Sequence, residues 1–507
     1  MELTENSFPR ALFRRGPVGM LSVRLVSGVE LVNFAAADFE ALIQDGGNSV
    51  RTLKRHLALL TGKPRFQQRL LCDGNVLDDS DPLSLPSSLL LVLVPFAEPE
   101  EGQLLRFKTA VENNDAKVVE AFLQRPQDPE TRLEPGSLPG LAVAARNDCA
   151  RPIPVLLEAR ANIERVHNNG LTALHIAINL GHMEAVRCLV ACRADPEKAT
   201  KSGTTPLCVA SVRGHLDLVR VLVEGGANLK KADPGGASPL HMACFFGHFQ
   251  LARWLVQAGA ECHRPDLRGA TPFHIACSSG ELKIARWLLT LRAEVNKTCS
   301  DGSTALLLAC SHGSAAVVRL LLENGADMTM TDREGTSALH RACSDGYLEI
   351  ARVLLDAGDD IDKSNKHGLG PLHLACAHGH VNVVRTLLYL GADKDKRDSE
   401  GSTPLHVGCV SGHLDVVRLL VKHGANKDAD QEGTTPVMMA SSCGHLKVVR
   451  FLVQAGADPR GIAQLPERSS PRRKTWPVQS WLQNGLGKVT TMLSQTSCTA
   501  TAKEGGG

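Results

Sequence analysis

The stretch GSTPLHVGCVSGHLDVVRLLVKHGAN, residues 401–426, contains the local signals that decide the fold. Thr403 followed by Pro404 predicts a helix start, because threonine caps free N–H groups and proline fits the first helical position. The apolar face that begins at Leu405 ends within two turns, at Gly412. The segment therefore opens with one short helix.

A second short helix is expected directly after the first. Between Leu414 and Lys422, apolar side chains recur at helical spacing on one side and charged side chains on the other. Gly424 should end this helix, since glycine is favoured just past a helix end. Neither helix is long enough to be stable alone in water, so a neighbouring element must cover its apolar face.

Repetition of the same unit supplies that neighbour. The opening glycine recurs every 33 residues, and once after 32, at Gly170, Gly203, Gly236, Gly269, Gly302, Gly335, Gly368, Gly401 and Gly433. A T-P-L-H-like tetrad follows at Thr172–His175, Ser238–His241, Thr271–His274, Ser337–His340 and Thr403–His406. The histidine is replaced at Cys208, Leu307 and Met438. In period and tetrad, residues 168–460 resemble the ankyrin repeat family, which implies a mostly α solenoid.

Composition excludes several other classes. A net charge of +2 and 4% aromatic residues disfavour a nucleic-acid binder. Fifteen cysteines without a secretory signal at the start predict free thiols and a cytoplasmic location, with the nucleus as the alternative. The longest apolar run, residues 89–96, is too short to enter a membrane as a spanning helix. We expect a monomer.

The N-terminal part has a different pattern. Residues 1–19 form a tail without expected structure. Apolar alternation in 21–26 and 29–34, helical spacing in 50–60, and strands at 66–71 and 89–94 predict a β-β-α-β-β order. With Gln67-Gln-Arg-Leu-Leu71 ahead of Gly74, residues 20–96 resemble a small α+β ubiquitin-like (β-grasp) domain.

That resemblance has two implications. Conjugable members of the family end in Gly-Gly, whereas this chain continues beyond Leu93, so conjugation through this domain is not expected. The family's recognition surface is an apolar patch on the sheet, and Leu71 and Val92 fall at its matching positions. The alternative is that these two side chains are ordinary sheet core, because the register decides which face they occupy.

The remaining segments extend the repeat array. Residues 97–102 form an acidic linker, and residues 103–167 are interpreted as two degenerate capping repeats, which gives about eleven repeats in all. Residues 461–507 are rich in Ser, Thr, Pro and Gly and are expected to be disordered. Within them, the basic cluster 470–474 is a solvated linker or a nuclear signal, and the apolar residues from Trp476 onward could add a short helix on the last repeat.

Histidine and cysteine recur as i, i+3 pairs on the first helix of several repeats, for example His340 and Cys343. Such pairs could bind a metal, but the resemblance makes the histidine a capping residue and the cysteine a small core residue. Arginine recurs on the second helix from Arg187 to Arg450, and neighbouring acids favour an ion-paired face over an anion-binding ridge. No catalytic motif is found, so we predict no catalytic residue, cofactor or metal, and a non-enzymatic protein.

The family binds partners on its concave face, through hairpin tips and the residues before the interhelical glycine. In this sequence the candidates at those positions are Arg213, Phe245, Phe246, His312, Asp345 and His378. Two adjacent aromatic residues among polar ones predict a binding hot spot at Phe245 and Phe246. The alternative places Phe246 under the adjacent hairpin and leaves only Phe245 exposed.

We therefore expect an adaptor that holds one protein on its repeats and presents the ubiquitin-like domain to a ubiquitin-pathway receptor. The alternative is a purely structural scaffold, in which the N-terminal domain only caps the repeat stack.

Overall fold

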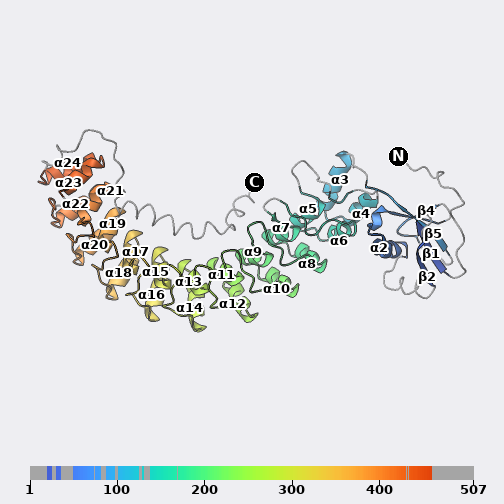
Figure 1. The fold of residues 1–507 in the computed structure, drawn as a ribbon, viewed down its shortest axis with the longest axis horizontal. Coiled ribbons are helices and arrows are strands. Elements are labelled where there is room, and N and C mark those ends of the chain that lie inside the picture. The colour runs from blue at the N-terminus through green and yellow to red at the C-terminus, as the bar shows by residue number, and fades with distance from the viewer. Residues whose placement is uncertain are drawn as a thin grey trace. The chain divides into compact units, whose positions relative to one another are not determined.

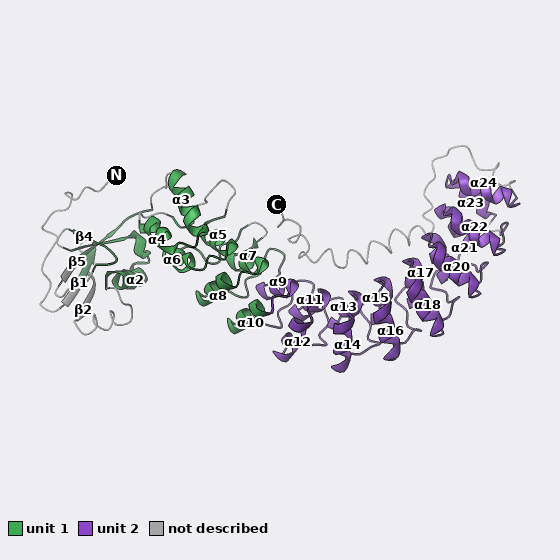
Figure 2. Ribbon diagram, turned by 180° about the vertical axis from the view of Figure 1, so that it is seen from behind, with its two compact units in different colours: residues 1–202, 217–227 green, residues 203–216, 228–507 purple. Residues whose placement is uncertain are grey.

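The computed structural model describes residues 20–25, 30–35, 49–72, 75–81, 87–96, 101–124, 128–130, 138–167, 170–429, 431 and 433–458. The expectations for 1–19 and 461–507 lie outside these residues. The chain divides into two compact units, one of residues 1–202 with 217–227 and one of residues 203–216 with 228–507 (Figure 2).

Unit 1 begins with a five-stranded sheet (Figure 1). Its elements are β1 (Met20–Leu25), β2 (Glu30–Ala35), α2 (Ser49–Thr61), the short 3₁₀ helix η2 (Arg65–Gln67), β3 (Gln68–Cys72), β4 (Asn75–Leu77) and β5 (Ser87–Leu93). The strand order is β2-β1-β5-β3-β4, with β1 parallel to β5 and the other pairs antiparallel. The predicted order of strands and helix is confirmed, and β4 is an additional strand too short to show alternation.

One face of the sheet packs against α2. Val23, Leu70 and Leu91 on this face form a core with apolar side chains of α2, and all three are fully buried. Leu71 and Leu90 pair across β3 and β5 and therefore share the opposite face. They are nevertheless only 4% and 3% exposed. The expectation of an open apolar patch is thus wrong at Leu71, while Val92 on the same face is half-buried.

Helix pairs follow the sheet. Their bounds are α3 (Glu101–Glu112), α4 (Ala116–Gln124), α5 (Gly140–Arg146), α6 (Pro152–Glu158), α7 (Ala173–Leu180), α8 (Met183–Ala191), α9 (Pro206–Arg213), α10 (Leu216–Glu224), α11 (Pro239–Phe245), α12 (Phe249–Gln257), α13 (Pro272–Ser278), α14 (Leu282–Thr290), α15 (Ala305–Ser311), α16 (Ala315–Glu323), α17 (Ala338–Ser344), α18 (Leu348–Asp356), α19 (Pro371–Ala377), α20 (Val381–Tyr389), α21 (Pro404–Ser411), α22 (Leu414–Lys422), α23 (Pro436–Ser442) and α24 (Leu446–Gln454). The two helices expected in residues 401–426 are confirmed as α21 and α22. Within unit 2, neighbouring first helices pack against one another, and the second helices form the outer row (Figure 1).

Where the tetrad histidine is present, it can bond to the following repeat. In α17, the backbone N–H of Ser337 donates to Nδ1 of His340, so the histidine caps its own helix. Nε2 of His340 lies 2.9 Å from the carbonyl oxygen of Leu369, in the following repeat. A carbonyl only accepts, so Nε2 carries the proton, and the ring is neutral because Nδ1 accepts the N–H of Ser337. Equivalent bonds run from His241, His373 and His406, whereas Nε2 of His274 donates to the carbonyl oxygen of Lys297, 23 residues further on.

A second histidine column connects several repeats to the preceding one. Nε2 of His380, at the start of α20, donates to the carbonyl oxygen of Ser344 at 2.9 Å. The ring lies against the interhelical Gly346, whose φ is +78°. A Cβ at Gly346 would lie 2.5 Å from the ring, so the position requires glycine for both its backbone and its space. His248, His413 and His445 make the same backward bond.

Acid should destabilise the repeats because the buried tetrad histidines must be neutral in the folded chain. Burial lowers the pKa of His340 and His373 to about 4 in the folded chain, against 6.5 for an ordinary histidine. The unfolded chain therefore binds more protons between these values, so stability is complete above pH 6.5 and falls as the pH drops towards 4. At pH 5 each of the two should have lost about 2 kcal/mol. Melting curves between pH 7.5 and 4.5 measure the effect.

Two substitutions separate this effect from general acid denaturation. His340→Leu, which copies Leu307 at the same repeat position, should flatten the dependence of melting on pH, although it lowers stability at neutral pH. Leu354→Ala, which removes a fully buried apolar group and no titrating one, should lower stability but leave the slope unchanged. Equal slopes for wild type and His340→Leu would contradict the assignment.

Candidate functional site

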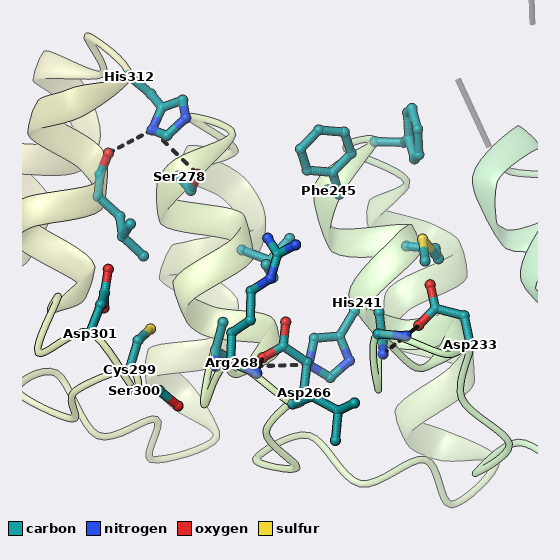
Figure 3. A pocket seen from close by; sticks show the side chains of 18 residues that line it. Asp233, His241, Phe245, Asp266, Arg268, Ser278, Cys299, Ser300, Asp301 and His312 are labelled. Carbon is teal, nitrogen blue, oxygen red and sulfur yellow. Dashed lines mark hydrogen bonds between the residues drawn. The ribbon is translucent and has the colours of Figure 1, made fainter. Parts of the chain in front are cut away.

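A groove of about 320 Å³ crosses three consecutive repeats of unit 2 (Figure 3). Its walls come from the first helices α11, α13 and α15, and its floor comes from the loops that precede them. Met242, Ile275 and Leu308 occupy the same position on the three helices, at intervals of 33 residues, and all three line the groove. The groove is therefore apolar along the helices.

Phe245 and Phe246 form one end of the groove. Their rings meet edge to face with centroids 4.9 Å apart. Phe245 is half-buried, and Phe246 is 37% exposed because it follows the last helical residue and its ring stacks beside His248. The alternative with Phe246 buried and Phe245 exposed is therefore wrong, since Phe246 is the more exposed ring.

His312 forms the opposite end of the groove, just after α15. Its Nδ1 lies 2.9 Å from the carbonyl oxygen of Leu308, to which it donates, and 3.4 Å from the hydroxyl of Ser278. These bonds fix the imidazole ring on the groove wall. The structure thus brings Phe245, Phe246 and His312 into one site.

The other three predicted positions do not line this groove. Arg213 is half-buried at the end of α9. Asp345 follows α17, and burial raises its pKa despite the nearby Arg341, His380 and His312. His378 follows α19, where Nδ1 donates to the carbonyl oxygen of Leu374 at 3.0 Å.

The loops give the floor an acidic character. Oδ1 of Asp233 accepts the backbone N–H groups of Gly235 and Ala237, both at 2.9 Å. Oδ1 of Asp266 accepts the equivalent N–H groups in the next repeat. Asp301 also lines the floor, and Figure 3 shows the Arg268 side chain rising from its loop into the groove. Three carboxylates and one guanidinium give this lining a formal charge of −2 at pH 7.

A neighbouring repeat shows why this charge remains. Asp332 stands at the position of Asp266 two repeats later, and its Oδ2 pairs with Arg341 at 2.6 Å. Ile275 takes the place of Arg341 beside Asp266, and Met242 takes it beside Asp233. The replacement of arginine by an apolar residue therefore creates the apolar wall and removes the cation that neutralises the aspartate. A comparison of equivalent repeat positions in the sequence would have revealed this missing arginine.

The groove has little capacity for metal or nucleophilic chemistry. Nε2 of His241 donates to the carbonyl oxygen of Ala270 at 3.1 Å, so this ring is used for structure. Burial raises the pKa of the Cys299 thiol to about 12, which keeps it protonated at neutral pH. Within the described residues, no group of three or more His, Cys, Asp or Glu side chains could hold a metal ion.

None of the helices in the described part of the chain is long and apolar enough to cross a membrane.

Comparison with known proteins identifies the repeats. The family model described as ankyrin repeats (3 copies) matches residues 107–200, 179–266, 240–332, 326–398 and 372–461, well over half of the chain. The chain therefore belongs to the ankyrin repeat family. A crystal structure of the human ASB11 ankyrin repeat domain is similar, with 30% identity over 44% of this chain and 99% of that chain and a TM-score of 0.41. No curated protein matches the chain.

Function and stability should separate at the groove. Leu240 is fully buried in α11, so Leu240→Ala leaves a cavity and should cost about 2–5 kcal/mol. Phe246→Ala removes a ring that is more than one-third exposed and should cost about 1 kcal/mol or less. Thermal melting of both variants measures the difference. A loss at Phe246 as large as that at Leu240 would make the ring part of the core.

Proposed function

We propose that the protein is a non-enzymatic scaffold that binds a partner protein in the groove between Phe246 and His312. The observation that carries the proposal is a half-exposed aromatic pair at the end of an apolar groove that spans three repeats. Aromatic side chains in partly desolvated pockets are the usual anchors of protein interfaces. The ankyrin repeat family membership supports the same role, because its repeats act mostly as interaction modules.

A photo-crosslinking experiment tests this function. A photoreactive phenylalanine analogue at Phe246 should give a covalent adduct with a discrete partner in cell extract. The same analogue at Arg286, on the second helix α14, serves as the control and should give no such adduct. Adding Phe245→Asp should abolish the adduct at residue 246. Equal adducts at both positions, or none at residue 246, would count against a binding groove at this site.

The role of the N-terminal sheet is a separate proposal. The order β2-β1-β5-β3-β4 with a helix between β2 and β3 is the topology that a ubiquitin-like domain implies, and it supports that resemblance. A link to ubiquitin or proteasome receptors requires an open patch at Leu71. Leu71 is buried, and Arg69 on the same face donates to the backbone carbonyl of Gln124 in α4. These contacts favour a domain that caps the repeats.

Arg65 is the centre of the capping contact. Its side chain is 2% exposed, and the guanidinium donates to Glu120 of α4 at 2.7 Å, to Glu158 of α6 at 2.6 Å and to Asp79 of its own domain. Burial opposes the charge of Arg65, but the three carboxylates outweigh it and raise the pKa. Lys54 pairs with Asp79 at 2.7 Å and completes the network. We therefore propose that the sheet domain takes the place of a terminal repeat.

Removing Arg65 should loosen the cap. Arg65→Ala leaves three partly buried carboxylates without their shared cation and should cost about 3 kcal/mol. Arg55→Ala is the matched control, because Arg55 also pairs with Glu158 but is 48% exposed, so its loss should cost under about 1 kcal/mol. Hydrogen exchange in α4 and α6 of the full chain reports the effect. Unchanged protection in Arg65→Ala would mean that the domain is an independent module, as the adaptor hypothesis requires.

A further inference from the structure

We propose that, in the absence of a partner, the groove binds the chain's own C-terminal segment PRRKTWPVQSWL, residues 471–482. This inference rests on the proposed function only in using the same groove. The segment would then act as an internal ligand, and an external partner would have to displace it.

The lining of the groove favours a ligand that carries an apolar side chain next to basic ones. Its helical wall is apolar at Met242, Ile275 and Leu308, and its aromatic end is partly exposed. Its floor carries Asp233, Asp266 and Asp301 against one arginine. A ligand with a large apolar anchor and several positive charges on one side complements both features.

The C-terminal segment has this composition. Arg472, Arg473 and Lys474 are consecutive, and Trp476 follows after one residue. The three positive charges match the three loop carboxylates, and an indole ring is the kind of anchor that a groove lined by Phe245 and Phe246 accommodates. The segment lies outside the described residues.

The chain is long enough to make this contact. Trp476 is 18 positions beyond Asp458, which follows the last repeat, and an extended chain of that length spans about 60 Å. Between α23 and α13 there are five repeat steps of about 10 Å each, or about 50 Å. Trp476 can therefore reach the centre of the groove from the end of the same unit.

Charge disfavours the nearer apolar surface. On α24, Leu446 is 73% exposed and Val453 is 39% exposed, so this last helix also offers apolar contact. However, α24 carries Lys447 and Arg450 and no acidic residue. A segment with three positive charges is repelled there and attracted by the acidic floor of the groove.

A fluorescently labelled synthetic peptide of residues 469–484 tests the proposal. It is titrated by anisotropy into the full-length chain that carries Arg472→Glu, Arg473→Glu and Trp476→Ala, whose own segment is disabled. We expect saturable binding that weakens as salt is raised. Adding Phe246→Ala should weaken binding at least tenfold. Adding Leu446→Asp on α24, the matched control, should change it less than twofold.

The wild-type full-length chain supplies the intramolecular test. A tethered segment has an effective concentration in the millimolar range, so the wild type should bind the peptide at least tenfold more weakly than the disabled chain. Equal binding by the two chains, or absence of binding by the disabled chain, would overturn the proposal. So would a loss caused by Leu446→Asp but not by Phe246→Ala, which would place the segment on α24. In each of these cases the photo-adduct at residue 246 would still decide the proposed function independently.

Discussion

The array depends on a neutral histidine buried between two repeats. Its Nδ1 accepts the N–H of the capping residue in its own helix, and its Nε2–H donates to a carbonyl of the following repeat. Acceptance at Nδ1 requires the neutral ring and donation to a carbonyl requires the proton on Nε2, so helix initiation and repeat stacking use the same side chain in a single tautomer. Where Leu307 replaces the histidine, Thr304 still accepts the N–H of Leu307, but the bond to the next repeat is lost. This bond therefore contributes to the interface between adjacent repeats, and that interface is weaker where the histidine is absent.

Much of this architecture could be predicted from the sequence, because a fixed spacing places each local signal in the same environment. The helix start at Thr403 and the helix end at Gly412 follow from capping and from a positive φ, which are local properties. The three residues of β4 were too few to produce a pattern. The burial of Leu71 could not be predicted either, because that face of the sheet depends on segments distant in the sequence, as the bond from Arg69 to α4 shows.

The groove was predictable in part. Phe245 and Phe246 stand out because the equivalent residues of other repeats are mostly polar, but the sequence did not show which ring is exposed. That depends on where α11 ends, within one residue. The acidic floor was missed for a different reason. Asp233 and Asp266 are ordinary turn residues of the repeat, and they become distinctive only because no arginine equivalent to Arg341 stands beside them.

The Arg65 network also bears on how the chain is made. Its acceptors in the repeats, Glu120 and Glu158, are 55 and 93 residues further along the chain. During synthesis the sheet residues therefore leave the ribosome well before their acceptors exist, and Arg65 then has Asp79 as its one partner from this network. Domains usually fold as units from the N-terminus, but this one acquires its full set of charge partners only after α6 has emerged. Translation of the first two repeats thus sets the earliest time at which the N-terminal domain reaches its final state.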